Sequence, residues 1–250
     1  MNKLLPLTIG YSTLVTRAKN IRFLSEVNNL VIIQNPDSVS LPDFPAGIQT
    51  LELRNKGVAK SRNAAISNAK TEYLIFGDDD IEFNESGINS AVDFLNNNPK
   101  ISILLMQAVD ETGALRKSYP SRAHKLKLTN SAKAATYEMM IRVADIKGAG
   151  VKFDENFGAG AENYLGDEYI FIADALRSGL TGSFQPIVIA MHPSESSGSL
   201  RNTSGDRVAR SKIFSRVFGI WAPFMRLLFI AKPPSKKFGL LNSVLFIIGK

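Results

Sequence analysis

No cysteine occurs among the 250 residues of the chain, which excludes a disulfide framework and a thiolate metal site. Any bound metal must therefore be held by oxygen or imidazole ligands. The lack of cysteine also fits a reducing cytoplasm. Residues 1–10 hold too short an apolar run for the core of a signal peptide, and they predict a first strand over residues 6–11 instead.

The net charge of +7 is unevenly distributed along the sequence. Residues 1–200 carry 20 Lys and Arg against 22 Asp and Glu, whereas residues 201–250 carry 10 against the single Asp206. A slightly acidic body is a poor match for a protein that coats a phosphate backbone, so we expect no nucleic acid partner. The basic tail needs its own explanation.

Short apolar runs alternate with helical patterns through most of the chain. This βαβ rhythm predicts an α/β fold with a mixed, mostly parallel sheet flanked by helices, in one domain over residues 1–200. The polar, basic stretch 110–135 is interpreted as a loop or lid for substrate contacts. Low complexity is limited to residues 194–199. Strands are predicted near 6–11, 30–33, 49–53, 72–76, 101–106, 138–143 and 187–190, and helices near 17–27, 57–69, 88–98 and 167–176.

Three consecutive carboxylates, Asp78, Asp79 and Asp80, follow the apolar run 72–76. Their mutual repulsion is costly unless they face solvent or a cation. Mg²⁺ and Mn²⁺ prefer oxygen ligands and leave positions for phosphate oxygens. Strand alternation puts Asp78 and Asp80 on one face and Asp79 on the other. A solvated acidic turn is the alternative, but open α/β sheets bind ligands at the carboxyl ends of their strands.

Cationic side chains precede the triplet at a predicted helix start. Lys60 and Arg62 follow Gly57, and the N–H groups and dipole of such a helix start suit an anion. The two side chains could instead be exposed helix charges. Together with the triplet, they favour a diphosphate site.

The run from Gly57 to Asn63, an alanine-rich helix and the run ending at Asp80 resemble the donor half of family-two glycosyltransferases with the GT-A fold. In that family the segment consists of Gly-x-x-x-x-Arg-Asn, a helix, a strand and Asp-x-Asp. The resemblance implies that Asp78 contacts the ribose or base side of the nucleotide and that Asp80 binds a Mn²⁺ or Mg²⁺ ion on the diphosphate. It also implies that Arg62 approaches the nucleotide.

Three more residues are assigned to the nucleotide-sugar site. Family members often carry an acidic turn, Asp-Asp-x-Ser, that reads the nucleobase after the second strand. This chain has residues 34–38 there, so Asn35 or Asp37 takes that part. Tyr11, at the end of the first predicted strand, and Asp79 complete the set.

A second block, residues 147–160 followed by Gly166, Asp167 and Glu168, is similar to the acceptor half of the same family. There, Phe-Asp-Glu-x-Phe precedes a glycine-rich loop and an acidic pair at a helix start. The likeness implies that the pair supplies the base that removes the acceptor hydroxyl proton. The family order is Glu-Asp and the order here is reversed, so which carboxylate is the base stays open. The pair could instead be helix N-terminal charges.

A late histidine, His192, follows the last predicted strand. GT-A enzymes often recruit a histidine from this position as a further metal ligand, and the likeness implies that role here. A lone histidine is otherwise structural.

The tail over residues 201–250 interleaves large apolar residues with Lys212, Arg216, Arg226 and Lys232. Because a spanning helix needs about 20 predominantly apolar residues, the two arginines favour an interfacial amphipathic segment on an anionic membrane surface. Residues 240–248 are a second apolar stretch, too short to span. The alternative is that the tail packs on the catalytic domain or on another copy, forming a homo-oligomer.

The sequence therefore predicts a metal-dependent, inverting glycosyltransferase with a donor half over 1–107 and an acceptor half over 108–200. It would move a sugar, with a UDP donor favoured, to a hydroxyl of a glycan or lipid-linked acceptor in cell-surface polysaccharide synthesis. We expect it at the inner face of the cell membrane. A nucleotidyltransferase is the alternative enzyme, but residues 10–15 lack its glycine-rich phosphate loop. A non-catalytic membrane adaptor of the same fold is the other alternative.

Overall fold

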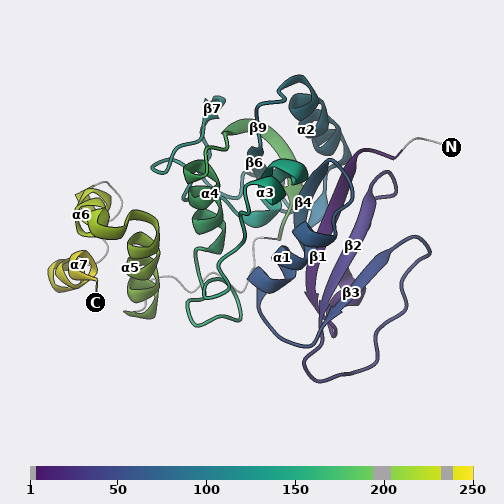
Figure 1. Cartoon of the computed structure of the whole chain (residues 1–250), viewed down its shortest axis with the longest axis horizontal. Helices are drawn as coiled ribbons and strands as arrows, with labels where there is room; N and C mark the ends of the chain where they lie inside the picture. Colours follow the sequence, from purple (N-terminus) through teal and green to yellow (C-terminus); the bar gives the residue numbers. More distant parts are fainter. Residues whose placement is uncertain (1–3, 194–203, 232–238, 250) are drawn as a thin grey trace.

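The computed structural model describes residues 4–193, 204–231 and 239–249. Within them, one nine-stranded sheet has the strand order β3-β2-β1-β4-β8-β6-β9-β5, with β7 paired to β9 (Figure 1). The strands are β1 (Leu7–Leu14), β2 (Asn28–Gln34), β3 (Gln49–Leu53), β4 (Tyr73–Asp78), β5 (Glu82–Phe83), β6 (Ile103–Val109), β7 (His124–Lys125), β8 (Met139–Arg142) and β9 (Gly182–Met191).

The sheet is mixed and mostly parallel through its first four strands, as predicted. β3, β2, β1 and β4 run parallel, β8 runs antiparallel to both β4 and β6, and β6 runs parallel to β9. The carboxyl ends of β1, β2 and β4 therefore meet at one edge, together with the start of β8. This is the edge at which ligands bind in open α/β sheets.

Helices cover both faces of the sheet, so the central strands are apolar along their whole length. In β4, Tyr73 and Ile75 enter the core under α2, whereas Leu74 and Phe76 enter the core under α1 and α4. The helices of this body are α1 (Val58–Asn68), α2 (Glu85–Asn97), α3 (Val143–Gly148) and α4 (Asp167–Arg177), with the 3₁₀ turns η1 (Ala18–Asn20) and η2 (Thr136–Glu138).

Two expected elements differ from the structure. The helix predicted over 17–27 is a loop with the single turn η1, because the amide of Asn29 donates to the carbonyls of Leu24 and Val27 and fixes the loop locally. The last strand begins at Gly182 instead of residue 187. Pro186 interrupts its pattern, and the structure absorbs that interruption in a register shift against β6.

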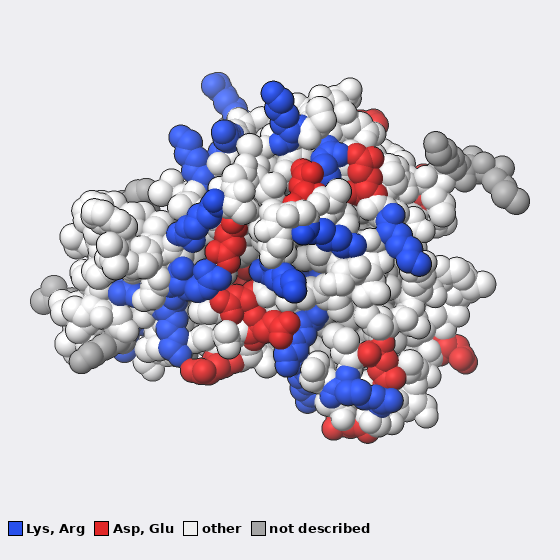
Figure 2. Space-filling view, in the orientation of Figure 1, with Lys and Arg blue, Asp and Glu red and all other residues white. Residues whose placement is uncertain are grey.

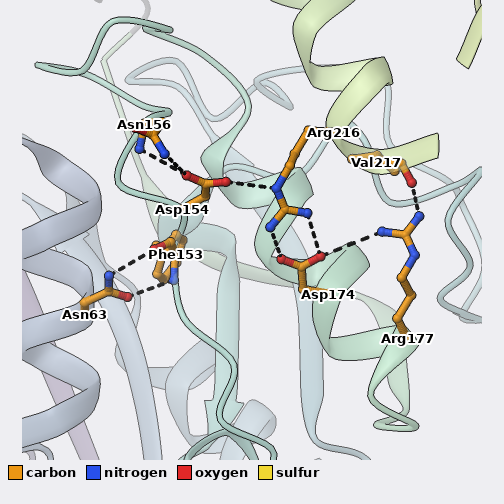
Figure 3. A network of polar contacts seen from close by, with 8 residues as sticks. All are labelled: Asn63, Phe153, Asp154, Asn156, Asp174, Arg177, Arg216 and Val217. Atoms are coloured by element: carbon orange, nitrogen blue, oxygen red, sulfur yellow. Dashed lines mark hydrogen bonds and ion pairs between the residues drawn. The ribbon is translucent and has the colours of Figure 1, made fainter. Parts of the chain in front are cut away.

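The first tail helix, α5 (Ser204–Phe218), packs on α4. Ile213 and Val217 share a core with Tyr169, Ile170 and Ala173. Figure 3 shows the polar side of this contact, where Arg216 bridges Asp154 at 2.9 Å and Asp174 at 2.6 Å, and Arg177 donates to the Val217 carbonyl. α5 is therefore packed onto the α/β body through α4.

The remaining tail elements lie against α5 at the end of the molecule opposite β3 (Figure 1). They are η3 (Gly219–Trp221), α6 (Ala222–Ala231) and α7 (Gly239–Ile248). Phe214 on α5, Phe229 on α6 and Phe246 on α7 contact one another through their rings. Among the described residues, one continuous helical stretch, Ser204–Ala231, is long and apolar enough to cross a membrane by length and composition.

Three cationic side chains of the tail, Lys212, Arg216 and Arg226, contact protein groups. Lys212 pairs with Glu162 at 2.9 Å, and Arg216 is engaged as described above. Arg226 is buried and donates to the carbonyls of Ser211 at 2.7 Å and Ile247 at 3.2 Å. In this structure these three side chains are thus engaged by protein groups, while Lys212 and Arg216 stay partly exposed. Lys232 and residues 194–199 lie outside the described residues.

Apolar side chains instead form the exposed surface of η3, α6 and α7, which we call the apolar tail face. Figure 2 shows this end of the molecule as almost entirely free of charged side chains. Its exposed large residues are Ile220, Trp221, Phe224, Leu227, Leu228, Leu241, Val244 and Ile248.

Candidate active site

The aspartate triplet stands where β4 leaves the sheet. Asp78 is the last residue of β4, and Asp79 and Asp80 form the turn after it. The side chains of Asp78 and Asp80 are 37% and 40% exposed, whereas that of Asp79 is 7% exposed. Asp79 is therefore the buried member of the triplet, and Asp78 and Asp80 are its exposed members.

Asp79 is held by protein groups on both carboxylate oxygens. Thr13 Oγ1 donates to Oδ2 at 2.6 Å, and Arg17 Nη2 lies 2.5 Å from Oδ1. These contacts satisfy a charge whose burial would otherwise be costly. Asp79 was assigned to the nucleotide-sugar site, but its side chain ties the end of β1 to the turn after β4.

Tyr11 was assigned to the same site and is also buried. Its ring has no exposed surface and packs edge-on against Phe23 and Phe83. Its hydroxyl donates to the Arg22 carbonyl at 3.1 Å. The assignment does not hold in this structure, because alternation along β1 directs Tyr11 into the core under α2.

Asn35, the proposed base reader, is fully buried and fixes its own turn. Its amide nitrogen donates to the Val39 carbonyl at 2.7 Å and to Glu52 at 2.6 Å, and its amide oxygen accepts from the Val39 N–H at 3.0 Å. These bonds use most of the hydrogen-bonding capacity of the amide. Asp37, the alternative, is exposed on the same turn.

The first two N–H groups at the start of α1 donate to protein acceptors. The Gly57 N–H donates to the Gln34 side chain at 2.8 Å, and the Val58 N–H donates to the Ala159 carbonyl at 3.0 Å. A side chain at Gly160 would lie 3.2 Å from Gly57. The glycine-rich loop of the second block therefore packs closely on this helix start.

Arg62 lies at the centre of the site, buried beneath the exposed carboxylates. It donates to Asp167, and its guanidinium nitrogens lie 3.7 Å from Glu168 and 3.9 Å from Asp78. Burial lowers the pKa of Arg62, but the surrounding carboxylates, Asp167 foremost, raise it by more, so the guanidinium stays charged. Arg62 thus joins the triplet to the acidic pair.

Asn63 makes the second connection between the two sequence blocks. Its side chain accepts from the Phe153 N–H at 2.8 Å and donates to the Phe153 carbonyl at 3.0 Å (Figure 3). The Arg-Asn pair of α1 therefore fixes both the Phe-Asp-Glu segment and the start of α4.

The acidic pair opens α4, and its two members differ in environment. Asp167 is 3% exposed and ion-paired to Arg62, whereas the Glu168 side chain is 23% exposed and accepts from Thr136 Oγ1 at 2.9 Å. Burial, followed by the neighbouring Asp167 carboxylate, raises the pKa of Glu168 to about 7. Glu168 can therefore exchange a proton near neutral pH.

His192 directly follows β9 and lies beside Asp80, with Nε2 3.7 Å from Oδ1. Its ring stacks on Tyr137, and Nδ1 lies 2.8 Å from the Pro193 carbonyl. Since a carbonyl only accepts, we assign the proton to Nδ1, which leaves a lone pair on Nε2. His192 Nε2 and Asp80 Oδ1 then face each other as two acceptors, and a cation bound to both stabilises this arrangement.

No group of three or more His, Asp or Glu in the part of the chain that the structure describes could hold a metal ion. Asp80 and His192 are thus the protein donors brought together here. Such a pair suits a hard cation that takes its other ligands from a phosphate and water.

The sequence comparison agrees with this arrangement. Residues 40–158 match the model of glycosyl transferase family 2, a range that contains Arg62, the triplet and the Phe-Asp-Glu segment. The chain is a glycosyltransferase with a family 2 domain match over this range. No curated protein matches its sequence.

Solved structures share the fold of this glycosyltransferase. The crystal structure of S. aureus TarS 1–349 in complex with UDP-GlcNAc matches with a TM-score of 0.62 at 15% sequence identity, covering 97% of this chain and 79% of that one. The complex of the same protein with UDP matches with a TM-score of 0.54 at 14% identity, covering 97% and 80%. The GT-A fold expected from the sequence is thereby confirmed.

The glycosyltransferase site also includes residues that the sequence did not single out. Ser12 pairs in register with Asp78, and its hydroxyl is buried with no partner among the described residues. Arg17 contacts Asp79 and Asp80, and Thr136 binds Glu168. Register with the triplet could have identified Ser12, but Arg17 and Thr136 reach the site only through tertiary packing.

Proposed function

We propose that this enzyme transfers a sugar from a UDP-linked donor to an acceptor hydroxyl, with inversion at the anomeric carbon. One observation carries the proposal: the Arg62 guanidinium contacts Asp78 on the donor side and Asp167 and Glu168 on the acceptor side. Donor and acceptor carboxylates thus lie around a single side chain. The UDP and UDP-GlcNAc complexes of the similar TarS fold support a uridine nucleotide.

Asp80 and His192 would hold a Mn²⁺ or Mg²⁺ ion in this proposal. The facing lone pairs of Nε2 and Oδ1 support it, as does the exposure of Asp80 toward the donor edge. The ion would neutralise charge on the departing diphosphate. Asp78 and the unpartnered Ser12 hydroxyl would contact the nucleotide beside it.

Glu168 would be the base, and Asp167 would position Arg62. Asp167 is buried and ion-paired to Arg62, so its carboxylate is occupied by a structural contact. Glu168 is accessible and has a pKa of about 7, which suits a general base at neutral pH. Its carboxylate would take the acceptor hydroxyl proton while that oxygen bonds to the anomeric carbon. The bond from that carbon to the diphosphate oxygen breaks, and UDP leaves with the electron pair.

The acceptor would approach from the side of α5. A cavity there is lined by the loop residues Glu162, Asn163 and Tyr164 and by the first turns of α5. This loop ends three residues before the acidic pair, so a hydroxyl held in the cavity lies on the Glu168 side of the site. A glycan or lipid-linked chain in cell-surface polysaccharide synthesis is the acceptor that we propose for this cavity.

The apolar tail face would rest on the cytoplasmic surface of the membrane. Trp221 and Phe224 are 66% and 55% exposed, and aromatic residues on such a face favour the headgroup boundary. Because Lys212, Arg216 and Arg226 contact protein groups, the contact between the tail and the membrane would be chiefly hydrophobic. Sedimentation with vesicles tests this: W221S/F224S should abolish it on neutral and anionic lipid alike. Sedimentation unchanged in this variant, or a protein found as a stable homo-oligomer through this face, would contradict the proposal.

A screen of nucleotide sugars with and without Mn²⁺ tests the chemistry. UDP-sugar hydrolysis or transfer that requires Mn²⁺ is expected, with D80N and E168Q each lowering the rate by roughly 10²–10⁴-fold. D93N, on the exposed face of α2, is the matched control and should leave the rate unchanged. Pyrophosphate release from a nucleoside triphosphate and a sugar phosphate would identify a nucleotidyltransferase. Nucleotide binding without turnover of any donor would identify an adaptor.

A further inference from the structure

Arg17 places a positive charge directly on the carboxylates of the proposed metal site. Its Nη2 lies 2.5 Å from Asp79 Oδ1 and 3.3 Å from Asp80 Oδ2. The two oxygens of Asp80 therefore face different cations: Oδ2 faces the guanidinium, and Oδ1 faces His192. A metal ion on Asp80 meets a resident cation that weakens its binding by charge repulsion.

The backbone at Arg17 and the Asp79 carboxylate each have a partner that does not depend on the Arg17 guanidinium. The Arg17 N–H donates to the Leu14 carbonyl at 2.9 Å, which fixes the backbone after β1, while the side chain is 47% exposed. Asp79 keeps the 2.6 Å bond from Thr13 when the guanidinium moves away. Only the side chain needs to rotate toward an arriving anion.

We infer that Arg17 is a displaceable counter-ion that makes metal binding depend on the nucleotide. In the empty site it neutralises Asp79 and Asp80 and lowers the affinity for a divalent ion alone. When the nucleoside diphosphate arrives with its metal, the guanidinium moves from Asp80 to the diphosphate oxygens, for which a planar guanidinium is a strong ligand. Arg17 is thus a donor-binding residue. This inference rests on the proposed function, since it requires a metal and a diphosphate at Asp80.

Mn²⁺ binding to the full-length protein, measured by electron paramagnetic resonance without any turnover, tests the inference. R17A should bind Mn²⁺ alone about two- to fivefold more tightly than the unaltered chain, the range expected for a half-exposed charge pair. With Mn²⁺ saturating, R17A should bind UDP about two- to fivefold more weakly by calorimetry. R17K keeps the charge without the planar fork and should fall between the two proteins in both measurements.

R22A is the matched control, because Arg22 forms an exposed ion pair with Glu82 and does not touch the triplet. It should leave both affinities unchanged. An R17A protein whose Mn²⁺ affinity equals that of R22A or falls below it would overturn the inference, as would a gain in UDP affinity. If the unaltered chain binds Mn²⁺ with UDP while R17A shows no change, this inference alone fails. If the unaltered chain binds neither, the proposed function fails first.

Discussion

Arg62 and Asp167 stand 105 positions apart in the sequence and form a buried ion pair at the centre of the site. Their side chains are 6% and 4% exposed, so each charge is compensated almost entirely by protein. The pair fixes the first turn of α4 against α1, and it therefore sets where Glu168 stands. The Arg62–Asp167 ion pair therefore both holds α4 against α1 and positions Glu168, the proposed base.

Arg62→Met should lower the free energy of unfolding by about 3–5 kcal/mol, because it leaves Asp167 buried without its cation. Urea denaturation measures this loss. Arg54→Met is the control, since Arg54 forms an exposed pair with Glu52 and should cost less than about 1 kcal/mol. The double variant Arg62→Met/Asp167→Leu should recover part of the loss. If Arg62→Met and Arg54→Met lowered the free energy of unfolding equally, the buried pair would not be stabilising.

The rate should depend on the ionisation of Glu168. Because its pKa is raised to about 7 and a base must be deprotonated, kcat/KM should rise with pH up to about 7 and level off above it. The pH profile of transfer measures this midpoint. A profile that is flat between pH 5 and 9 would exclude Glu168 as the base.

Thr136→Val should move that midpoint to higher pH. The Thr136 hydroxyl donates to the Glu168 carboxylate and favours its charged form, so its loss raises the pKa further. Thr136→Ser keeps the hydroxyl and should keep the midpoint. A Thr136→Val profile that matches the Thr136→Ser profile would show that this bond does not tune the base.

Gly158→Ala should lower stability by more than the strain of a positive φ alone explains, and it should also lower kcat. Gly158 has a positive φ of 95°, and an added Cβ would lie 2.7 Å from Asp167 Cγ. Gly150→Ala is the control, because Gly150 also has a positive φ, 66°, but a Cβ there meets nothing within 4 Å. The control should lose about 1–2 kcal/mol from the left-handed backbone. Gly158→Ala should lose more stability, and kcat should fall because Asp167 and Glu168 shift. Equal losses by urea denaturation would contradict this.

Truncation should separate the two parts of the tail. A chain that ends at Phe218 keeps Ile213 and Val217 on α4, so it should melt near the temperature of the full chain and lose vesicle binding. A chain that ends at Arg210 loses both residues and exposes the core around Ile170, so its melting temperature should fall by several degrees. Similar melting curves for the two truncations would show that α5 is not part of the body.

Local patterns were sufficient where an element depends on its own sequence. The limits of β3 and the start of α4 at Asp167 agree with the prediction, and α1 starts at Val58, one residue after Gly57. The outward direction of Asp78 and Asp80 also followed from strand alternation alone. These features need no knowledge of distant residues.

Burial decides how three of the residues assigned to the nucleotide-sugar site use their polar groups. Tyr11, Asn35 and Asp79 have polar groups suited to a nucleotide, but each is satisfied by a partner that packing supplies. Arg17 was overlooked for the converse reason, because nothing near it in sequence shows that it reaches Asp80. The inward orientation of Arg216 and Arg226 likewise depends on the contacts of α5, which periodicity does not reveal.

The reversed direction of β8 has a consequence for how the enzyme can diversify. The stretch between β6 and β8 leaves the sheet at the carboxyl end of β6 and returns at the start of β8, and the antiparallel pairing puts both points on the same edge. Segments of other lengths and chemistry can therefore be exchanged between these two anchors without a change in strand order. Because η2 follows at the return point, any exchanged segment ends beside Glu168 and His192. Residues 110–135 thus form an insertion attached to the sheet through β7 and β9, and the rest of the insertion can vary while the order of the central strands stays the same.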